Sequence, residues 1–402
     1  MFKSKDIVKM KLLKVSFDHL RMFEDGLFEI DLFASDRVPA DDESATSLSG
    51  TIYSNNILGF AGINASGKTT ALALLELAGR IMDGVPVVGG NLTETVCTLF
   101  DASSNFKALV CEGRDCYLVE SRIVCVEDDR PGAWSLSFSE EIVSAVPAKS
   151  LRRTDLLSWD ALKSASSPMC RRTEIADSWI VLASPDVSIA GAVIAKKAGG
   201  RSRVPVFRDD DFVLKSGFDG LDAVLRVFDP SIEHLKVADE GRAFLAKFKG
   251  RDELVLSGQG LKEVLSSGTY RGIALIGRAV SALRSGGYLL VDEIENHLNR
   301  QLVNVVLDLF SSRETNPNGG TLVFTTHYPQ LLDHVRRKDN IYFLATTYGD
   351  GSKVVKYCDR VKRIENKKSE VFVSSFIKGT APRYIDVKSL KSLITQKVED
   401  NE

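Results

Sequence analysis

The sequence predicts an α/β fold with a mixed sheet, an antiparallel β lobe and an inserted, mostly helical subdomain, and three observations lead to it. A short apolar run, Ile57–Ala61, passes through a glycine-rich loop into a helical pattern, as a buried parallel strand does. Alternating segments between about residues 95 and 143 indicate antiparallel strands. Later apolar strands end in polar residues, as at the ligand-binding edge of a parallel sheet. We therefore expect an N-terminal lobe (1–147), the insertion (148–257), a third lobe (258–350) and a C-terminal segment (351–402).

The composition is that of a globular protein with a sizeable core. Of the 402 residues, 44% are hydrophobic and 26% are charged. The net charge of −2 shows that the chain lacks the overall basic excess typical of many nucleic-acid-binding proteins. A local basic face on the surface is still compatible with this charge. No apolar run is long enough to cross a membrane and no apolar signal segment opens the chain, so we expect a cytoplasmic protein without a membrane partner.

The cysteines and histidines do not predict a zinc site. The six cysteines are scattered without a C-x-x-C pair, and the five histidines show no ligand spacing. We expect reduced thiols, as in most cytosolic proteins.

The N-terminal lobe begins with strand patterns at Met10–Phe17 and Leu27–Phe33. The polar, acidic stretch Ser35–Gly50 predicts a surface loop. The alternating segments that follow the first helix predict strands at Phe106–Cys111, Tyr117–Val126 and Trp134–Phe138.

The insertion shows three helical patterns, at Asp155–Ala165, Glu174–Ala183 and Gly220–Phe228. Its basic pairs could touch a phosphate backbone, but charge pairs on helices are more often solvated surface. These pairs are Arg152–Arg153, Arg171–Arg172 and Lys196–Lys197. A hairpin is expected within Arg242–Leu256.

The third lobe starts with a polar loop that runs into a helix over Leu265–Leu283. Buried strands are expected at Tyr288–Glu293 and Thr321–Thr326, with a helix between them. The remaining patterns predict strands at Ile341–Thr346 and Lys353–Tyr357 and helices at Asn366–Ile377 and Asp386–Val398.

The segment Gly62–Thr69 reads G-x-x-x-x-G-K-[ST], the pattern of a phosphate-binding loop. Two glycines let the backbone turn tightly, so that the amides of Ala65–Thr69 can point at an anion near the helix start. Lys68 is expected to reach the β- and γ-phosphates of ATP, and Thr69 to ligate Mg²⁺. A chance glycine-rich turn is the alternative, which the strand before the loop and the helix after it disfavour. The expected nucleotide contacts are Gly62, Asn64, Ala65, Ser66, Gly67, Lys68, Thr69 and Thr70.

Two later strands end in residues suited to catalysis. Asp292 and Glu293 follow an apolar strand, which places them at the carboxyl edge of the sheet. We expect Asp292 to hold Mg²⁺ and Glu293 to polarise the attacking water. His327 follows the next buried strand and is a candidate contact to the γ-phosphate. The alternative is that His327 is a structural residue of the turn after this strand. The predicted catalytic residues are therefore Lys68, Glu293 and His327.

Four pieces occur in a fixed order: GINASGKT from Gly62, LSSGT from Leu265, YLLVDE from Tyr288 and TTH ending at His327. This set resembles the ABC-type ATPase head of the branch that contains RecF, the SMC proteins and the OLD-family ATPases. It also resembles the AAA-like ATP-binding proteins of bacterial anti-phage defence operons. The resemblance spans roughly residues 11–343.

The resemblance implies that two chains bind ATP between them as a head-to-tail homodimer or a higher homo-oligomer. In such heads the LSSGT segment engages the γ-phosphate held by the opposite protomer, which assigns Ser266 and Gly268 a role in trans. Glu295–Leu298 resembles the D-loop region at the same interface. Arg21 and Phe23 stand where related heads carry a basic–aromatic motif near the nucleotide.

The chain departs from the family in two ways. ABC heads carry a glutamine that senses Mg²⁺ at the start of an inserted lobe, and none of the four glutamines here lies at such a position. The Toprim nuclease domain of OLD proteins is also missing from this chain, as are long coiled-coil arms. We therefore expect a separate effector protein, for example a Toprim-like nuclease. Lys378–Leu393 is a candidate docking segment for it, with a helix that closes the core as the alternative.

Rival interpretations remain at this stage. A RecF-like DNA-repair ATPase would bind DNA and be stimulated by it. A nucleotide-regulated scaffold would hydrolyse ATP negligibly, which the intact catalytic set argues against. A transporter ATPase is disfavoured because no glutamine is placed for coupling to a membrane domain.

Overall fold

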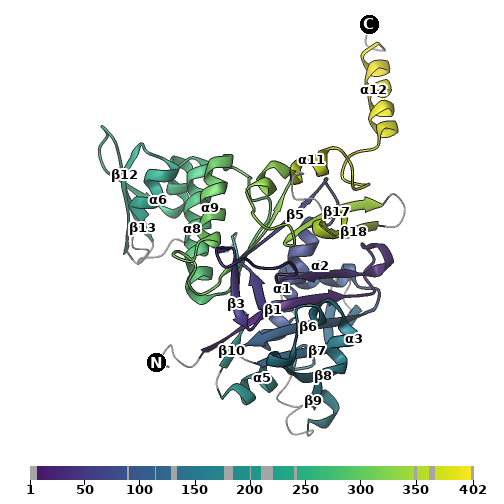
Figure 1. The fold of residues 1–402 in the computed structure, drawn as a ribbon. Coiled ribbons are helices and arrows are strands. Elements are labelled where there is room, and N and C mark those ends of the chain that lie inside the picture. The colour runs from purple at the N-terminus through teal and green to yellow at the C-terminus, as the bar shows by residue number, and fades with distance from the viewer. Residues whose placement is uncertain are drawn as a thin grey trace.

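The computed structural model has a mixed α/β fold with several sheets, among them a mixed, mostly parallel sheet (Figure 1). It describes residues 7–87, 90–113, 115–127, 134–175, 184–199, 201–209, 221–239, 242–347, 351–361 and 367–399. Two large sheets lie on either side of helix α1 (Lys68–Asp83), because the buried apolar residues of α1 belong to one core with residues of both sheets.

The central sheet has the strand order β11-β15-β16-β5-β17-β18. Neighbouring strands run parallel except for β18, which pairs antiparallel with β17. β5 and β16 are fully buried, as expected for strands covered on both faces. The strands are β5 (Ile57–Gly62), β11 (Val206–Arg208), β15 (Tyr288–Val291), β16 (Thr321–Thr326), β17 (Ile341–Thr347) and β18 (Gly351–Lys356).

Successive residues of the central strands face opposite cores. Leu290, Val323 and Phe60 belong to the core shared with α1, whereas Leu289 and Phe324 pack with helices on the other face. The helices of that second face are α8 (Ser267–Ser285), α9 (Arg300–Ser311), α10 (Tyr357–Arg360) and α11 (Lys368–Val373).

The second large sheet has the order β10-β1-β6-β7-β8-β9, with β2 paired to β1. It is antiparallel apart from the β1–β10 pair. The predicted strands form. Four of them extend further than their sequence patterns, whereas β2 is shorter than the predicted strand Leu27–Phe33. The bounds are β1 (Ile7–Phe17), β2 (Phe28–Asp31), β6 (Ser103–Glu112), β7 (Asp115–Glu127), β8 (Trp134–Pro147), β9 (Ser167–Arg171) and β10 (Arg201–Arg203).

The prediction of a mostly helical insertion over 148–257 is not confirmed. Its described part supplies β9 and β10 to the antiparallel sheet and β11 to the central sheet. Strands as short as β10 and β11 are too short to show a period in the sequence. Helices α3 (Trp159–Ser164), α5 (Ala190–Ala198) and α6 (Leu221–Phe228) are present, while most of the pattern at Glu174–Ala183 lies outside the described residues.

A small third sheet follows, with the order β12-β13-β14. It packs with α6, α7 and the start of α8 around a core of its own. The expected hairpin within 242–256 is confirmed, since β13 and β14 pair antiparallel. The elements are β12 (Ile232–Ala238), β13 (Ala243–Phe248), β14 (Leu254–Ser257) and α7 (Gly258–Val264).

Some local predictions were wrong. Ser35–Gly50 is not only loop, because β3 (Ala45–Ser49) pairs with β4 (Ile52–Asn55). Helix α2 (Gly90–Leu99) occupies the start of the stretch that the alternation assigned to strands. Short 3₁₀ turns lie at Glu24–Gly26, Ala148–Ser150, Asp155–Leu157, Arg172–Glu174 and Pro329–Asp333.

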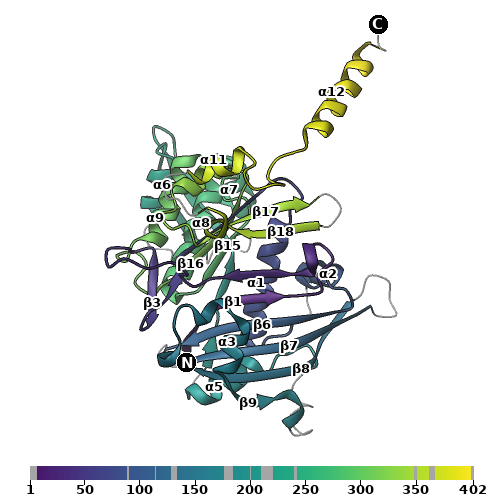
Figure 2. The same ribbon diagram turned by 45° about the vertical axis from the view of Figure 1, so that its right-hand side comes forward.

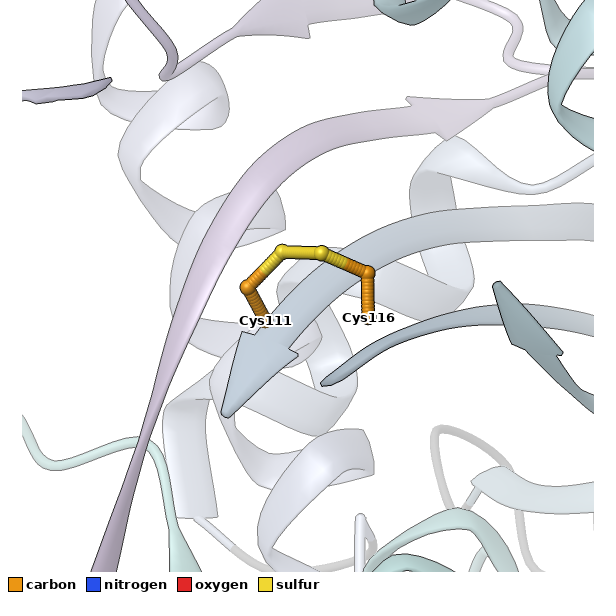
Figure 3. The surroundings of a disulfide bond; sticks show 2 residues. All are labelled: Cys111 and Cys116. Atoms are coloured by element: carbon orange, nitrogen blue, oxygen red, sulfur yellow. A yellow bond between two sulfur atoms is a disulfide. The ribbon is translucent and has the colours of Figure 1, made fainter. Parts of the chain in front are cut away.

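The expectation of reduced thiols is wrong for one pair of cysteines. Cys111 and Cys116 form a disulfide across the β6–β7 hairpin (Figure 3). The strand register pairs these two residues directly, with their Cα atoms 4.1 Å apart. Their placement on either side of the predicted turn was a sequence signal for this contact. The four other cysteines have free thiols.

Helix α12 (Tyr384–Glu399) projects away from the body of the protein in both views (Figures 1 and 2). Its apolar side chains are exposed, Tyr384 by 81% and Leu390 by 59%. The alternative to a docking role was that this helix closes the core. The described residues do not show such packing.

Removing residues 384–402 is expected to change the melting temperature by less than about 2 °C, because α12 buries little apolar area against the rest of the chain. Phe372→Ala in α11 is the matched comparison, since Phe372 is buried edge-on against Phe343. Its loss is expected to cost about 3–5 kcal/mol. Thermal melting of the three proteins measures this, and a large drop after truncation would mean that α12 packs on the body.

Candidate functional site

The candidate site lies where three neighbouring parallel strands end. β16 lies between β15 and β5, so the ends of these strands meet at one edge of the central sheet. The phosphate loop (Gly62–Thr69) leaves β5, Asp292 and Glu293 leave β15, and His327 leaves β16. Segments more than 200 residues apart in sequence are thereby joined in one place.

The phosphate loop needs its two glycines for different reasons. A Cβ on Gly62 would lie 2.2 Å from Ser66 Oγ and 2.8 Å from the carbonyl oxygen of Leu344, so the loop closes only over a bare backbone. Gly67 has φ +87° and caps α1 from the left-handed region, which other residues rarely adopt. Ala65 also has a positive φ, of 59°. The loop is therefore tightly wound around the start of α1.

Lys68 is folded back into the loop that carries it. Its side-chain nitrogen donates to the carbonyl oxygens of Gly62 and Ile63, each at 3.0 Å, and lies 3.5 Å from His327 Nδ1. Burial lowers the pKa of Lys68, and the carboxylates of Glu293 and Asp292 oppose that shift. Within the part of the chain that the structure describes, no carboxylate forms a direct ion pair with Lys68 Nζ, and such a buried cation attracts an anion into the cavity.

Thr69 and Asp292 meet directly. The Thr69 hydroxyl donates to Asp292 Oδ2 at 2.7 Å, and the Thr325 hydroxyl donates to Asp292 Oδ1 at 2.5 Å. A hydroxyl and a carboxylate beside a phosphate loop are the donor set that Mg²⁺ uses when it completes its shell with phosphates and water. Among the described residues, no group of three or more His, Cys, Asp and Glu side chains could hold a metal ion without such added ligands.

Glu293 and His327 form a second pair over the same loop. His327 Nε2 lies 3.1 Å from Glu293 Oε1, with the two side chains 30% and 47% exposed. The backbone amide of His327 donates to Glu295 Oε1 at 2.7 Å. Glu293 thus lines the cavity with a partly exposed side chain, and such a carboxylate can accept a proton from water.

The turn that carries Glu293 is strained. Glu293 has φ +47°, a region that costs a non-glycine residue on the order of 1–3 kcal/mol. Its amide donates to the Thr325 hydroxyl at 2.8 Å, so the same threonine bonds both Asp292 and Glu293. Thr325 was missed by the sequence reasoning. Its position two residues before His327, on a strand next to β15, is the signal that could have found it.

A cavity of about 400 Å³ opens over these groups. It brings together most of the predicted nucleotide contacts with Glu293 and His327. Met22, which the sequence did not single out, lines it too, and Thr70 donates to its sulfur at 3.4 Å. Its lining is Met22, Asn64, Ala65, Ser66, Gly67, Lys68, Thr69, Thr70, Glu293 and His327.

The predicted basic–aromatic pair is only partly at this cavity. Arg21 lies 3.5 Å from Asp101 and points elsewhere. Phe23 is buried, and its ring is the nearest side chain to where a Cβ on Gly67 would stand. The residue between them, Met22, is the one that lines the cavity.

Ser266 and Gly268 do not line the cavity around Lys68. The Ser266 hydroxyl caps α8 by accepting from the amide of Thr269 at 3.0 Å. Gly268 packs on the 292–297 turn, where a Cβ would lie 2.6 Å from the carbonyl oxygen of His297. Their neighbours Ser267 and Tyr270 line a separate cavity of about 730 Å³, which also contains Asp292 and Glu293.

The comparison with known proteins concerns this second half of the site. Residues 201–333 match the family model described as "AAA domain, putative AbiEii toxin, Type IV TA system", which covers 133 of the 402 residues. This match supports an AAA/ABC-like P-loop ATPase. No curated protein matches the chain.

The matched part of the chain contains Asp292, Glu293 and His327, while the phosphate loop lies outside it. The structure joins the two parts at one cavity, in keeping with nucleotide binding. None of the described helices is both long and apolar enough to span a bilayer.

Proposed function

We propose that the protein is a Mg²⁺-dependent ATP hydrolase that dimerises around ATP. The observation that carries this proposal is the convergence of Lys68, the Thr69–Asp292 pair and the Glu293–His327 pair at the cavity over the phosphate loop. This is the set of parts that phosphoryl transfer to water requires: an anion cradle, a metal-ion anchor and a base.

Each residue has a separate role in this proposal. The loop amides and Lys68 bind the β- and γ-phosphates, and Lys68 then exchanges its bonds to loop carbonyls for bonds to phosphate oxygens. Thr69 and Asp292 hold Mg²⁺, which neutralises charge on the transferring phosphoryl group when it is bound. Glu293 accepts the proton of the attacking water. His327 orients Glu293 and donates to the γ-phosphate, which its position between Glu293 and Lys68 allows.

Hydrolysis of ATP by the purified protein, with and without linear duplex DNA, tests the proposal. We expect hydrolysis that requires Mg²⁺ and that DNA does not change. Stimulation by DNA would instead favour a RecF-like repair function. Wild-type protein as inactive as Glu293→Gln would contradict the proposed hydrolase and favour a nucleotide-regulated scaffold.

The dimer is proposed because Ser266 and Gly268 lie outside the cavity that contains Lys68 in the same chain. In a head-to-tail pair, the segment 265–269 of one protomer would cover the phosphate loop of the other. Both ATP molecules would then be held between the two chains.

Mixing two inactive variants is expected to restore hydrolysis to at most about a quarter of the wild-type rate, given the composite site and random pairing of chains. The variants are Lys68→Ala and Ser266→Arg. In a mixed dimer, one of the two sites has an intact Lys68 from one chain and an intact Ser266 from the other. Each variant alone is the control, and a mixture no faster than its components would contradict the dimer.

We further propose that this ATPase is the switch subunit of a bacterial anti-phage defence system with a separate effector. The toxin–antitoxin wording of the matched family and the resemblance of the motif set support this role. The exposed apolar side chains of α12 offer a surface for such an effector. Binding of a candidate effector, such as a Toprim-like nuclease encoded beside this protein, to full-length and 384–402-deleted chains would test it. Equal binding of the effector by both chains would show that α12 is not the effector-binding surface.

A further inference from the structure

Arg271 lies in the first turns of α8 and forms hydrogen bonds to the turn that carries Asp292 and Glu293. Its Nη2 donates to the carbonyl oxygen of Asp292 at 2.9 Å and to that of Glu293 at 3.2 Å. The same nitrogen lies 3.0 Å from Asp209 Oδ2. The Arg271 side chain is 23% exposed and that of Asp209 11%, so water competes little for these bonds.

This turn needs to be held, because Glu293 adopts a positive φ. Thr325 on β16 holds its amide side, through the 2.8 Å bond from the Glu293 amide. Arg271 holds its carbonyl side from α8. The direction of the Glu293 side chain therefore depends on where α8 stands relative to β16.

The contacts of Arg271 continue to the helix that starts at the phosphate loop. Asp209 follows directly after β11. In the preceding residue, Arg208, the side-chain Nη1 lies 3.3 Å from Oε2 of Glu76 on α1. A chain of ion pairs and hydrogen bonds thus runs from α1 through the end of β11 and α8 to the turn at Glu293. Neither Arg271 nor Asp209 lines the cavity over the phosphate loop; both line the neighbouring cavity with Ser267 and Tyr270.

We propose that Arg271 is a positioning residue for Glu293, and that it transmits the position of the 265–269 segment to the catalytic carboxylate. The inference rests on the proposed function. A ligand or protein that engages residues 265–269 displaces the start of α8, and Arg271 carries that displacement to the Asp292 and Glu293 carbonyls. All three contacts are made by the single nitrogen Nη2, whose two N–H groups are shared among two carbonyls and a carboxylate. The shorter side chain of lysine does not place its ammonium group where Nη2 lies.

The kinetic test compares Arg271→Ala, Arg271→Lys and, as a matched control, Arg284→Ala in the exposed last turn of the same helix. Both Arg271 variants are expected to lower kcat by about 10-fold or more and to change the KM for ATP by less than about twofold, as for a residue that acts on the transition state alone. Guanidinium chloride at low millimolar concentration should restore part of kcat to Arg271→Ala, and not to Glu293→Gln. The double variant with Glu293→Gln should be no slower than Glu293→Gln alone.

A second measurement does not depend on hydrolysis. Amide hydrogen exchange in residues 292–298 should be about 10-fold faster in Arg271→Ala than in the wild type or Arg284→Ala, because the turn loses one of its two anchors. Asp209→Asn, which leaves Arg271 in place, should give a smaller increase in the exchange rate of residues 292–298. This variant replaces Arg271→Ala in the experiment if Arg271→Ala does not fold.

The two measurements separate the inference from the proposed function. A wild-type protein that does not hydrolyse ATP contradicts the function, while the exchange experiment still tests Arg271. Unchanged exchange in 292–298 overturns the inference, and so does a wild-type kcat in Arg271→Ala when Glu293→Gln is inactive. Faster exchange together with a kcat loss that guanidinium reverses supports it.

Discussion

Replacing Glu293 with glutamine is expected to lower kcat for ATP hydrolysis by about 100-fold or more, the usual contribution of a general base. Glutamine has the shape of glutamate and can keep the contact to His327 Nε2, which is 3.1 Å away in the wild type. It cannot accept a proton from water. The loss should therefore fall on the chemical step and leave ATP affinity within about threefold of the wild type.

Steady-state hydrolysis and equilibrium binding of a fluorescent ATP analogue measure the two effects separately. Glu314→Gln is the matched control, since Glu314 is an exposed carboxylate on the loop after α9 and lines neither cavity. A Glu293→Gln protein that hydrolyses ATP at the wild-type rate would remove Glu293 from the mechanism. Glu295, whose Oε1 accepts from the His327 amide, would then be the next carboxylate to test.

Lys68→Ala is expected to weaken ATP binding by about 10- to 100-fold, the cost of losing charge-assisted hydrogen bonds to phosphate. Hydrolysis should fall below detection, because the same cation also stabilises the transferring phosphoryl group. The fold should survive. The lost bonds go to the Gly62 and Ile63 carbonyls inside one loop, and removing a cation whose pKa is lowered by burial also removes its desolvation cost.

Binding of the fluorescent analogue to Lys68→Ala and to Lys68→Arg, beside thermal melting of both, tests this expectation. Arginine keeps the charge in a bulkier side chain, so its affinity should fall between those of alanine and wild type if charge dominates. Wild-type affinity in Lys68→Ala would mean that ATP does not bind over the phosphate loop. A large loss of melting temperature would mean instead that Lys68 mainly supports the loop structure.

The parts of this protein that were predictable from sequence are those that a short segment encodes by itself. The phosphate loop was predictable from its two glycines, because the local backbone requires each of them. Ser66 and Leu344 lie too close to Gly62 to leave room for a Cβ, and Gly67 adopts a positive φ. The strands β5, β15 and β16 were predictable for a similar reason, since continuous apolar runs are typical of strands buried on both faces. The acids and the histidine after these strands followed from the same local pattern.

What the sequence could not indicate are contacts between segments that are far apart along the chain. Thr325 and Arg271 hold the turn at Glu293. Nothing in its own segment distinguishes Arg271 from a surface arginine, and Thr325 is marked only by its position two residues before His327. The short strands β10 and β11 join sheets only because β1 and β15 offer them an edge.

The sequence alone therefore established the chemical groups of the candidate site, from Lys68 to His327, because each belongs to a motif whose backbone geometry is local. Only the tertiary structure decided which of them meet. The strand order β15-β16-β5 brings Asp292, Glu293 and His327 to the phosphate loop, while Ser266 and Gly268 stay outside the cavity over that loop. Strand order is set by the packing of whole sheets on shared cores, a property of the complete chain that no single motif contains.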